Sequence, residues 1–196
     1  MKNNPRFEIF TGPMFGGKTT RLIAALERYK YQNKNLILFK PSIDGRYSKS
    51  TIVTHSGISW DNKNSFCKTQ IVDTGIDLLK IFGDFHKIHS IDVVGIDEAF
   101  MIPEVAKAAI EIYKSGVTVL VSSLQLSSAG KPYEEMSTLL PWATNVQICP
   151  AVCSVCGEDA FFTRKKSGED NGEIEVGGSE LYEPVCFRHY FDNVNL

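Results

Sequence analysis

The chain of 196 residues lacks any hydrophobic run that approaches the length needed to cross a membrane. Its first residues, Met1 to Pro5, contain no hydrophobic stretch of the kind that marks a secretion signal. Neither sign of charge predominates, since 21 basic and 23 acidic residues leave a net charge near −2, which gives no general attraction to nucleic acid. We therefore expect a cytoplasmic protein without a membrane or nucleic-acid partner.

Cysteines are few, and five of them in a reducing compartment are not expected to form disulfides. Two are isolated, Cys67 and Cys149, and are interpreted as small, partly buried side chains. The other three lie in the last quarter of the chain. No internal repeat is evident, and the length suits one good hydrophobic core with a small appendage.

Apolar runs rich in β-branched residues alternate with helical patterns through the first two-thirds of the chain, which predicts an α/β fold with a parallel sheet flanked by helices. One helix is expected to open at Pro103 and to end before Gly116. After Pro150 the sequence becomes rich in cysteine, charge and glycine, so we place a domain boundary there, between residues 1–150 and 151–196. The expected strands are 7–11, 36–39, 91–96 and 117–121, with 146–148 as a possible edge strand. A loop or hairpin is expected at 42–65, and a charged loop at 165–172.

The most informative motif follows the first apolar run and reads Gly12-Pro13-Met14-Phe15-Gly16-Gly17-Lys18-Thr19. Its glycines allow backbone N–H groups to surround a β-phosphate, Lys18 brings a positive charge, and Thr19 offers a hydroxyl to Mg²⁺. A helical pattern begins directly after the motif, so strand, loop and helix stand in the order that a phosphate-binding loop needs. A chance glycine-rich turn is the alternative. The motif predicts binding of a nucleoside triphosphate.

A second nucleotide-binding signal is the acidic pair Asp97-Glu98 at the end of the apolar run 91–96. An acidic residue at the end of a buried strand is costly unless it serves a metal or a charged partner. Ligand sites in this fold class lie beyond the carboxyl ends of the parallel strands, so Asp97 fits as the acid that holds Mg²⁺. Glu98 is then a candidate general base. The alternative is an acid pair that caps a helix.

The C-terminal part contains two pairs of metal-ligating residues at matched spacing, Cys153-x-x-Cys156 and Cys186-x-x-His189. Two such pairs can converge on one tetrahedral zinc ion. Four protein ligands leave no position for substrate water, so we interpret the site as a structural one that joins the ends of a poorly hydrophobic insert. A redox-active Cys-x-x-Cys is the alternative.

Together these motifs resemble those of the cellular-type thymidine kinases, the zinc-containing type II family. The resemblance runs in order from Phe7 to about Phe191. Besides the phosphate loop and the two zinc pairs, it rests on Lys40-Pro41 with Asp44-x-Arg46-Tyr47, on Thr54-His55-Ser56-Gly57, on Ile96-Asp97-Glu98-Ala99, and on Lys131-Pro132-Tyr133.

The resemblance implies a phosphate-loop α/β domain that uses ATP and Mg²⁺, and a small zinc-binding subdomain that sends a lasso-like loop over the nucleoside. It implies transfer of the γ-phosphate of ATP to the 5′-hydroxyl of thymidine, giving dTMP. Glu98 would take the proton from that hydroxyl, and Arg46 would stabilise the transferring phosphoryl group, unless Arg46 is an ordinary surface arginine. The phosphate- and metal-binding residues would be Gly12, Pro13, Met14, Phe15, Gly16, Gly17, Lys18, Thr19, Thr20 and Asp97.

The nucleoside pocket is implied in the same way. Met14 would lie near the thymine methyl group, backbone groups of the lasso would bind the pyrimidine, and Tyr182 would pack on it, unless this tyrosine is only a structural aromatic. Glycines suit a backbone that approaches a planar base closely. The implied substrate-binding residues are Met14, Met101, Leu124, Ser128, Tyr133, Thr163, Glu175, Val176, Gly177, Gly178 and Tyr182.

Three positions depart from the family pattern. Met101 and Ser128 stand where aromatic residues usually line the base pocket, and Gln125 stands where an aspartate is usual. Loss of aromatic packing on a base costs about 1–3 kcal/mol of binding unless neighbours such as Phe100 or Tyr133 fill the space.

Three other functions stay open beside thymidine phosphorylation. They are a kinase with a shifted pyrimidine preference, such as deoxyuridine; a zinc-containing ATPase acting on single-stranded nucleic acid; and a regulatory subunit without catalysis. The resemblance also implies a homotetramer and feedback inhibition by dTTP.

Overall fold

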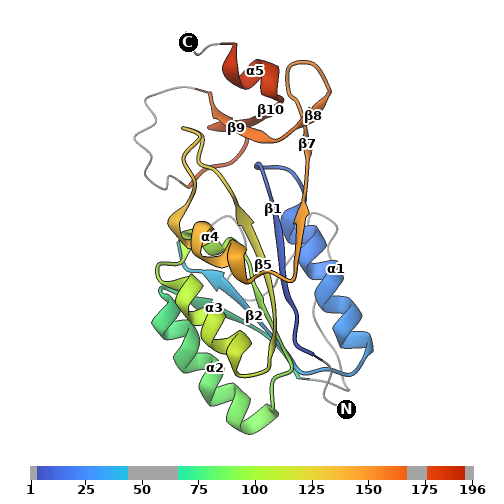
Figure 1. Ribbon diagram of the computed structural model, residues 1–196, viewed down its shortest axis with the longest axis vertical. Coiled ribbons are helices and arrows are strands. Elements are labelled where there is room, and N and C mark those ends of the chain that lie inside the picture. Colours follow the sequence, from blue (N-terminus) through green and yellow to red (C-terminus); the bar gives the residue numbers. More distant parts are fainter. Residues whose placement is uncertain (1–3, 44–65, 167–175, 193–196) are drawn as a thin grey trace.

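Six parallel strands form the central sheet of the protein in the computed structural model, which describes residues 4–43, 66–166 and 176–192 (Figure 1). The strand order is β3-β2-β4-β5-β1-β6, and every neighbouring pair is parallel. The carboxyl ends of all six strands therefore lie at one edge of the sheet. The strands are β1 (Phe7–Gly12), β2 (Leu36–Pro41), β3 (Cys67–Val72), β4 (Val93–Ile96), β5 (Thr118–Leu124) and β6 (Asn145–Ile148).

Helices cover both faces of this sheet, as its apolar sequence requires. Every residue of β2 and β4 is buried, so these strands need cover on each side. The helix α1 (Lys18–Tyr31) packs on one face, and α2 (Gly75–His89), α3 (Val105–Lys114) and the short α4 (Glu134–Leu139) lie on the other (Figure 1). Two 3₁₀ turns follow β4 and α4, η1 (Ala99–Met101) and η2 (Leu140–Trp142).

The predicted α/β class is confirmed, and the four expected strands and the edge strand at 146–148 are all present. The helix that was expected to open at Pro103 begins instead at Val105, so its predicted start was wrong. The reason is a tertiary contact: Glu104 has a left-handed backbone (φ 61°), and the carboxylate of Glu135 on α4 accepts hydrogen bonds from the N–H groups of Glu104 and Ala106. Gly116 follows the end of α3 with φ +91°, as expected.

A small subdomain stands beyond the carboxyl edge of the sheet (Figure 1). It contains two antiparallel strand pairs and one short helix, with an apolar cluster of its own built on Ala151, Cys153, Ala160 and Val185. Within the described residues, no helix has the length and apolar character that would let it span a bilayer. The elements are β7 (Ala151–Val152), β8 (Asp159–Ala160), β9 (Phe162–Lys165), β10 (Tyr182–Val185) and α5 (Phe187–Phe191).

Candidate active site

The phosphate loop connects β1 to α1 at the carboxyl edge of the sheet. Gly12 has a φ of +147°, which favours glycine, and a Cβ built on it would lie 2.3 Å from the carbonyl oxygen of Cys149. A Cβ on Gly16 would meet the same oxygen at 2.3 Å. Gly17 then has a left-handed backbone (φ +70°) directly before α1. The loop thus needs its glycines because the chain after β6 passes directly against it.

The first turn of α1 places the polar residues of the motif. Lys18 is buried and donates from Nζ to the carbonyl oxygen of Pro13 at 2.7 Å, so its ammonium group lies inside the curve of the loop. Thr19 is half-buried beneath the loop, and Thr20 is exposed beside it. Backbone N–H groups at a helix N-terminus, together with an ammonium group, form a site for the phosphates of a nucleotide.

Asp97 lies directly after β4, facing the first turn of α1. Only 2% of the residue is exposed, and its Oδ1 accepts hydrogen bonds from Thr19 Oγ1 at 2.9 Å and from Ser122 Oγ on β5. A carboxylate paired with the threonine hydroxyl of a phosphate loop is the arrangement that holds Mg²⁺ in nucleotide-binding proteins of this class. The residues present therefore fit Mg²⁺, with Thr19 and Asp97 as the groups that would hold it.

Lys40, near the carboxyl end of β2, completes this cluster and was assigned no role in the sequence analysis. Its Nζ lies 3.9 Å from Asp97 Oδ2, and the two side chains are 10% and 3% exposed. A lysine within the wholly buried strand β2 was the available signal, because a charge in such a place needs a partner. The Asp97 carboxylate thus lies between two hydroxyls and an ammonium group.

Glu98 follows Asp97 and is half-buried, with a left-handed backbone (φ 48°). It occupies the residue before η1 but makes no side-chain capping hydrogen bond there. A capping role, the alternative for the acidic pair, therefore has no support from the geometry. A left-handed non-glycine residue is uncommon, and such conformations concentrate at functional sites.

An apolar cluster lies beside the acidic pair and unites residues from four segments. Phe100, Met101 and Leu124 are buried in it, and Met14 of the phosphate loop and Tyr133 pack against them. The rings of Phe100 and Tyr133 lie 4.7 Å apart between centroids at 43°. Four of the residues expected to bind substrate are thus brought together, and Phe100 lies in the same cluster against Tyr133.

The small subdomain contacts this site through β9. Thr163 is buried, and its Oγ1 accepts a hydrogen bond from the N–H of Met14 at 3.0 Å, joining residues 149 apart in sequence. The predicted substrate residue Thr163 therefore holds the phosphate loop at the residue that also borders the apolar cluster.

The expected lasso residues are described only in part. Tyr182 is buried on β10, with its N–H bonded to Gly178 O at 3.0 Å, and Val176 and Gly177 precede this turn. Arg46 and Glu175 lie outside the described residues, as do Asp44, Tyr47 and the segment 54–57.

The four predicted zinc ligands converge between the β7–β8 turn and α5. Their ligand atoms all lie within 4.8 Å of one another. Cys156 Sγ and Cys186 Sγ are 3.8 Å apart, and His189 Nδ1 lies 3.3 Å from Cys186 Sγ and 3.6 Å from Cys153 Sγ. Two thiolates that each lie about 2.3 Å from a tetrahedral zinc ion are about 3.8 Å apart, so this cluster fits Zn²⁺.

The acidity of Cys153 agrees with that fit, whereas the pKa of Cys156 is raised: a backbone hydrogen bond at Glu158 lowers it, but burial and the neighbouring Cys153 and Cys186 side chains outweigh that bond. Burial by itself raises the pKa of the Cys153 thiol, but hydrogen bonds from backbone groups, those of Cys186 and Val155 among them, outweigh it and lower the pKa to about 6. Such a thiol is largely ionised near neutral pH, as a zinc ligand must be. Burial instead raises the pKa of Cys67 to about 11, which agrees with its interpretation as an ordinary buried side chain.

A parallel sheet with a phosphate loop, a buried acid opposite the loop threonine and a Cys₃His cluster that could bind zinc together define a nucleotide-binding α/β protein. A family model described as thymidine kinase matches residues 6–190. The chain belongs to the thymidine kinase family.

Individual relatives support this assignment. The chain is 35% identical to a thymidine kinase of Thermococcus kodakarensis over 189 residues, covering 93% of this chain and 92% of the relative. It is 33% identical to a thymidine kinase of Pyrobaculum aerophilum over 187 residues, which cover 93% and 96% of the two chains. A thymidine kinase of Choristoneura fumiferana entomopoxvirus is 34% identical over 189 residues, covering 95% and 96%.

Proposed function

We propose that this protein phosphorylates thymidine, transferring the γ-phosphate of ATP to the 5′-hydroxyl to give dTMP and ADP. The observation that carries the proposal is the position of Met14. Met14 belongs to the phosphate loop, its N–H donates to Thr163 Oγ1, and its side chain packs against the apolar cluster. The phosphate site and an apolar cluster that offers a surface for a pyrimidine therefore share one residue, as a kinase for nucleosides needs.

Positioning and charge neutralisation would supply most of the catalysis. Lys18 and the N–H groups around it bind the donor phosphates, while Thr19 and Asp97 hold Mg²⁺. That ion, when bound, neutralises charge on the transferring phosphoryl group. Arg46 adds a planar cation to the same group.

Glu98 is the proposed base. It adjoins the Mg²⁺-binding acid on one side and, through Phe100 and Met101 of η1, the apolar cluster on the other. A carboxylate at this junction can accept the proton of a hydroxyl whose sugar lies between the base pocket and the phosphates.

Base specificity depends on the apolar cluster and the lasso. We propose that Met14, Met101, Leu124 and Tyr133 line one side of the base, that Glu175 to Gly178 and Tyr182 close over it, and that Phe100 replaces the missing aromatic surface. A second candidate is a kinase that prefers deoxyuridine or a modified pyrimidine. It is favoured by Met101 and Ser128, which leave less aromatic surface than the family pattern.

The remaining assignments complete the proposal. Zn²⁺ held by the Cys₃His cluster has a structural role in a subdomain that begins at residue 151. The protein acts in the cytoplasm as a homotetramer and is inhibited by dTTP.

The experiment measures Mg·ATP-dependent phosphorylation of thymidine, deoxyuridine, deoxycytidine and purine nucleosides side by side. Thymidine is expected to have the highest kcat/KM, and a higher value for deoxyuridine would favour the second candidate. Glu98→Gln is expected to lower kcat by about 10²- to 10⁴-fold while ATP binding, measured by calorimetry, stays unchanged. Near-parental turnover in that variant would exclude Glu98 as the base.

A further inference from the structure

We propose that Tyr190 is a positioning residue for the nucleoside pocket: its hydroxyl holds the loop between β5 and α4, and it thereby couples nucleoside binding to the zinc site. The inference rests on the proposed function, because it assumes that this loop borders the bound nucleoside. It concerns a residue of α5 that lies outside the pocket.

The contact itself is specific. Tyr190 Oη donates to the carbonyl oxygen of Ser128 at 2.7 Å, across 62 residues of sequence. Ser128 lies at the tip of a tight loop, because Leu126 pairs with Pro132 in an antiparallel bridge and Ser127 N–H donates to Lys131 O at 2.8 Å. The hydrogen bond from Tyr190 therefore fastens the tip of this loop to α5.

The loop begins and ends in the apolar cluster. Leu124 is the last residue of β5, and Tyr133 directly precedes α4; both belong to the cluster with Met14. The N–H of Tyr133 donates to Gln125 O at 3.4 Å, so the two ends are joined. A displacement at Ser128 therefore reaches the groups that would contact the base.

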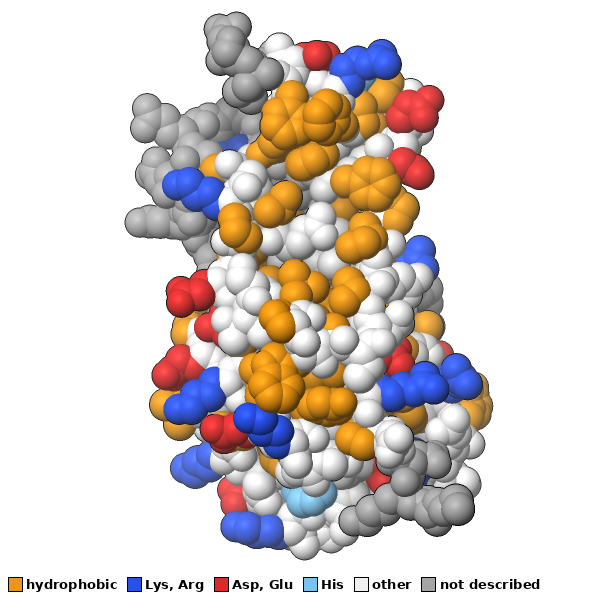
Figure 2. All heavy atoms as spheres, viewed as in Figure 1, with side chains coloured by type: hydrophobic (Ala, Val, Ile, Leu, Met, Phe, Trp, Pro, Cys, Tyr) orange, Lys and Arg blue, Asp and Glu red, His pale blue; other side chains and the backbone are white. Residues whose placement is uncertain are grey.

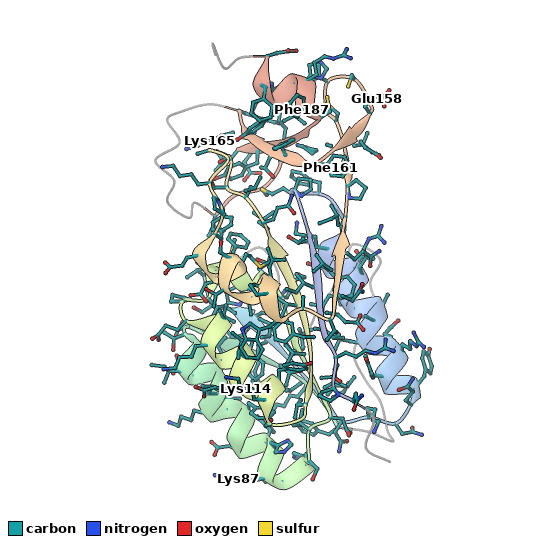
Figure 3. All side chains as sticks on the ribbon, viewed as in Figure 1. Lys87, Lys114, Glu158, Phe161, Lys165 and Phe187 are labelled. Atoms are coloured by element: carbon teal, nitrogen blue, oxygen red, sulfur yellow. The ribbon has the colours of Figure 1, made fainter. Side chains whose placement is uncertain are left out.

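The tyrosine ring is held in place by the zinc subdomain. It stacks on Phe162 of β9 with centroids 4.7 Å apart at 19°, and Phe191 meets it edge-on at 5.0 Å. The zinc ligand His189 directly precedes Tyr190, whose N–H donates to the carbonyl oxygen of the ligand Cys186 at 3.0 Å. The hydroxyl group is thus placed by the residues that place the metal ligands. Hydrophobic side chains gather on this part of the molecule (Figure 2), and Phe161 and Phe187 are labelled there in Figure 3.

A network of charged groups strengthens the same connection. Arg164 donates from one nitrogen to His189 O at 2.8 Å and from two others to Glu183 Oε1 at 3.0 and 2.8 Å. Glu183 Oε2 accepts from Ser154 Oγ at 2.7 Å, beside Cys153. Successive residues of a strand point to opposite sides, so Arg164 faces the zinc ligands from β9 while its neighbour Thr163 faces the phosphate loop.

The two sides of the proposed nucleoside pocket are therefore joined to the zinc subdomain. Met14 is joined to it by the hydrogen bond to Thr163, and the loop 126–132 by the hydrogen bond from Tyr190 to Ser128. If bound zinc orders both sides of the pocket and thereby favours nucleoside binding, then by linkage the bound nucleoside must favour zinc binding to the same degree. This reciprocity gives a measurement that does not depend on turnover.

The test uses Tyr190→Phe, which removes the hydroxyl and keeps the stacked ring. A net hydrogen bond of about 0.5–1.5 kcal/mol predicts a KM for thymidine raised about 2- to 12-fold, with kcat, the KM for ATP and the zinc content unchanged. Hydrogen exchange in residues 126–132 is expected to accelerate. Thymidine is expected to raise the chelator concentration that removes half of the zinc from the parent at equilibrium, and to raise it less in the variant. Tyr31→Phe, which removes a hydroxyl from a residue 86% exposed, is the matched control.

An unchanged KM for thymidine together with unchanged exchange in 126–132 would overturn the proposal, and so would equal protection of zinc by thymidine in both proteins. Loss of zinc together with a general fall in kcat would show a merely structural role. If Tyr190→Phe does not fold, Phe162→Leu loosens the ring while keeping the hydroxyl and must shift the same measurements in the same direction. A parent that phosphorylates no nucleoside would refute the proposed function, whereas the exchange measurement would still test the contact.

Discussion

Replacement of Asp97 by Asn removes one negative charge from the proposed Mg²⁺ site and changes almost no volume. Asp97 Oδ1 accepts both hydroxyl hydrogen bonds, from Thr19 and Ser122, and the amide oxygen of Asn can keep both. The amide nitrogen then takes the place of Oδ2, which lies 3.9 Å from Lys40 Nζ. The substitution therefore isolates the charge of Asp97 from its shape.

The expected loss of folding stability follows from the ion pair with Lys40. Loss of one partner of a buried pair lowers the free energy of unfolding by about 3–5 kcal/mol when the two groups are in contact. Here the two atoms are beyond hydrogen-bonding distance, so we expect about 2–3 kcal/mol. A chain of this length loses about 2–4 °C of Tm per kcal/mol, which gives a fall of about 4–12 °C. The control is Asp92→Asn at the opposite end of β4, where the pair with Lys34 is 37–40% exposed and contributes about 1 kcal/mol or less.

The decisive assay is calorimetric binding of ATP with and without Mg²⁺. Loss of a charged ligand is expected to weaken binding of Mg·ATP by about 10- to 100-fold. Metal-free ATP is a polyanion that Asp97 repels, so Asp97→Asn is expected to bind it as tightly as the parent or more tightly. A Tm within about 1 °C of the parent would refute the role of the ion pair. An equal loss of affinity for Mg·ATP and for metal-free ATP would refute the proposal that Asp97 binds the metal.

Two other predictions concern the phosphate loop and the zinc subdomain. Gly16→Ala places a Cβ 2.3 Å from the carbonyl oxygen of Cys149, which is backbone and cannot easily move, so we expect Tm to fall and ATP affinity to drop by about tenfold or more. The control is Gly83→Ala, in open space on α2, which is expected to raise stability by about 0.5–1 kcal/mol. Equal effects of the two substitutions would contradict the steric argument. Hydrogen bonds from Ser154 and Arg164 hold the pKa of Glu183 below its usual value of 4.5, so the stability it adds is present above pH 4.5 and is lost as pH falls through its folded-state pKa. Glu183→Gln should therefore lower Tm at pH 6–7, and its deficit should shrink below pH 4.5; a deficit independent of pH would show that ionisation of Glu183 is irrelevant.

Local patterns were sufficient for much of the fold. Strands β1, β2, β4 and β5 are largely apolar because both faces of a parallel sheet are covered, and this pattern is visible without any tertiary information. The segment from 66 to 90 received no prediction, although it contains β3 and α2. Strand β3 is half-exposed at the sheet edge and has no strong apolar pattern. Helix α2 did carry a signal, since Thr74 accepts from Asp77 N–H as its N-cap.

The candidate site was predictable to the same extent. The phosphate loop and the Cys₃His ligands are motifs whose spacing alone predicts their chemistry. Within each motif, the structure brings the predicted residues together. Asp97 was found because it follows a buried strand. Lys40 was missed as a partner of Asp97, because nothing in the sequence shows that the ends of β2 and β4 are adjacent.

The sequence alone thus predicted a triphosphate-binding loop, an acid suited to Mg²⁺ and a zinc-type cluster, because each prediction depends on residue types at fixed intervals. Only the tertiary structure decided what surrounds them. The carbonyl group of Cys149 that excludes side chains at Gly12 and Gly16, the bond from Met14 to Thr163 and the bond from Tyr190 to Ser128 all join distant segments. Such contacts depend on where the sheet places its strand ends, and no local interval in the sequence encodes that placement.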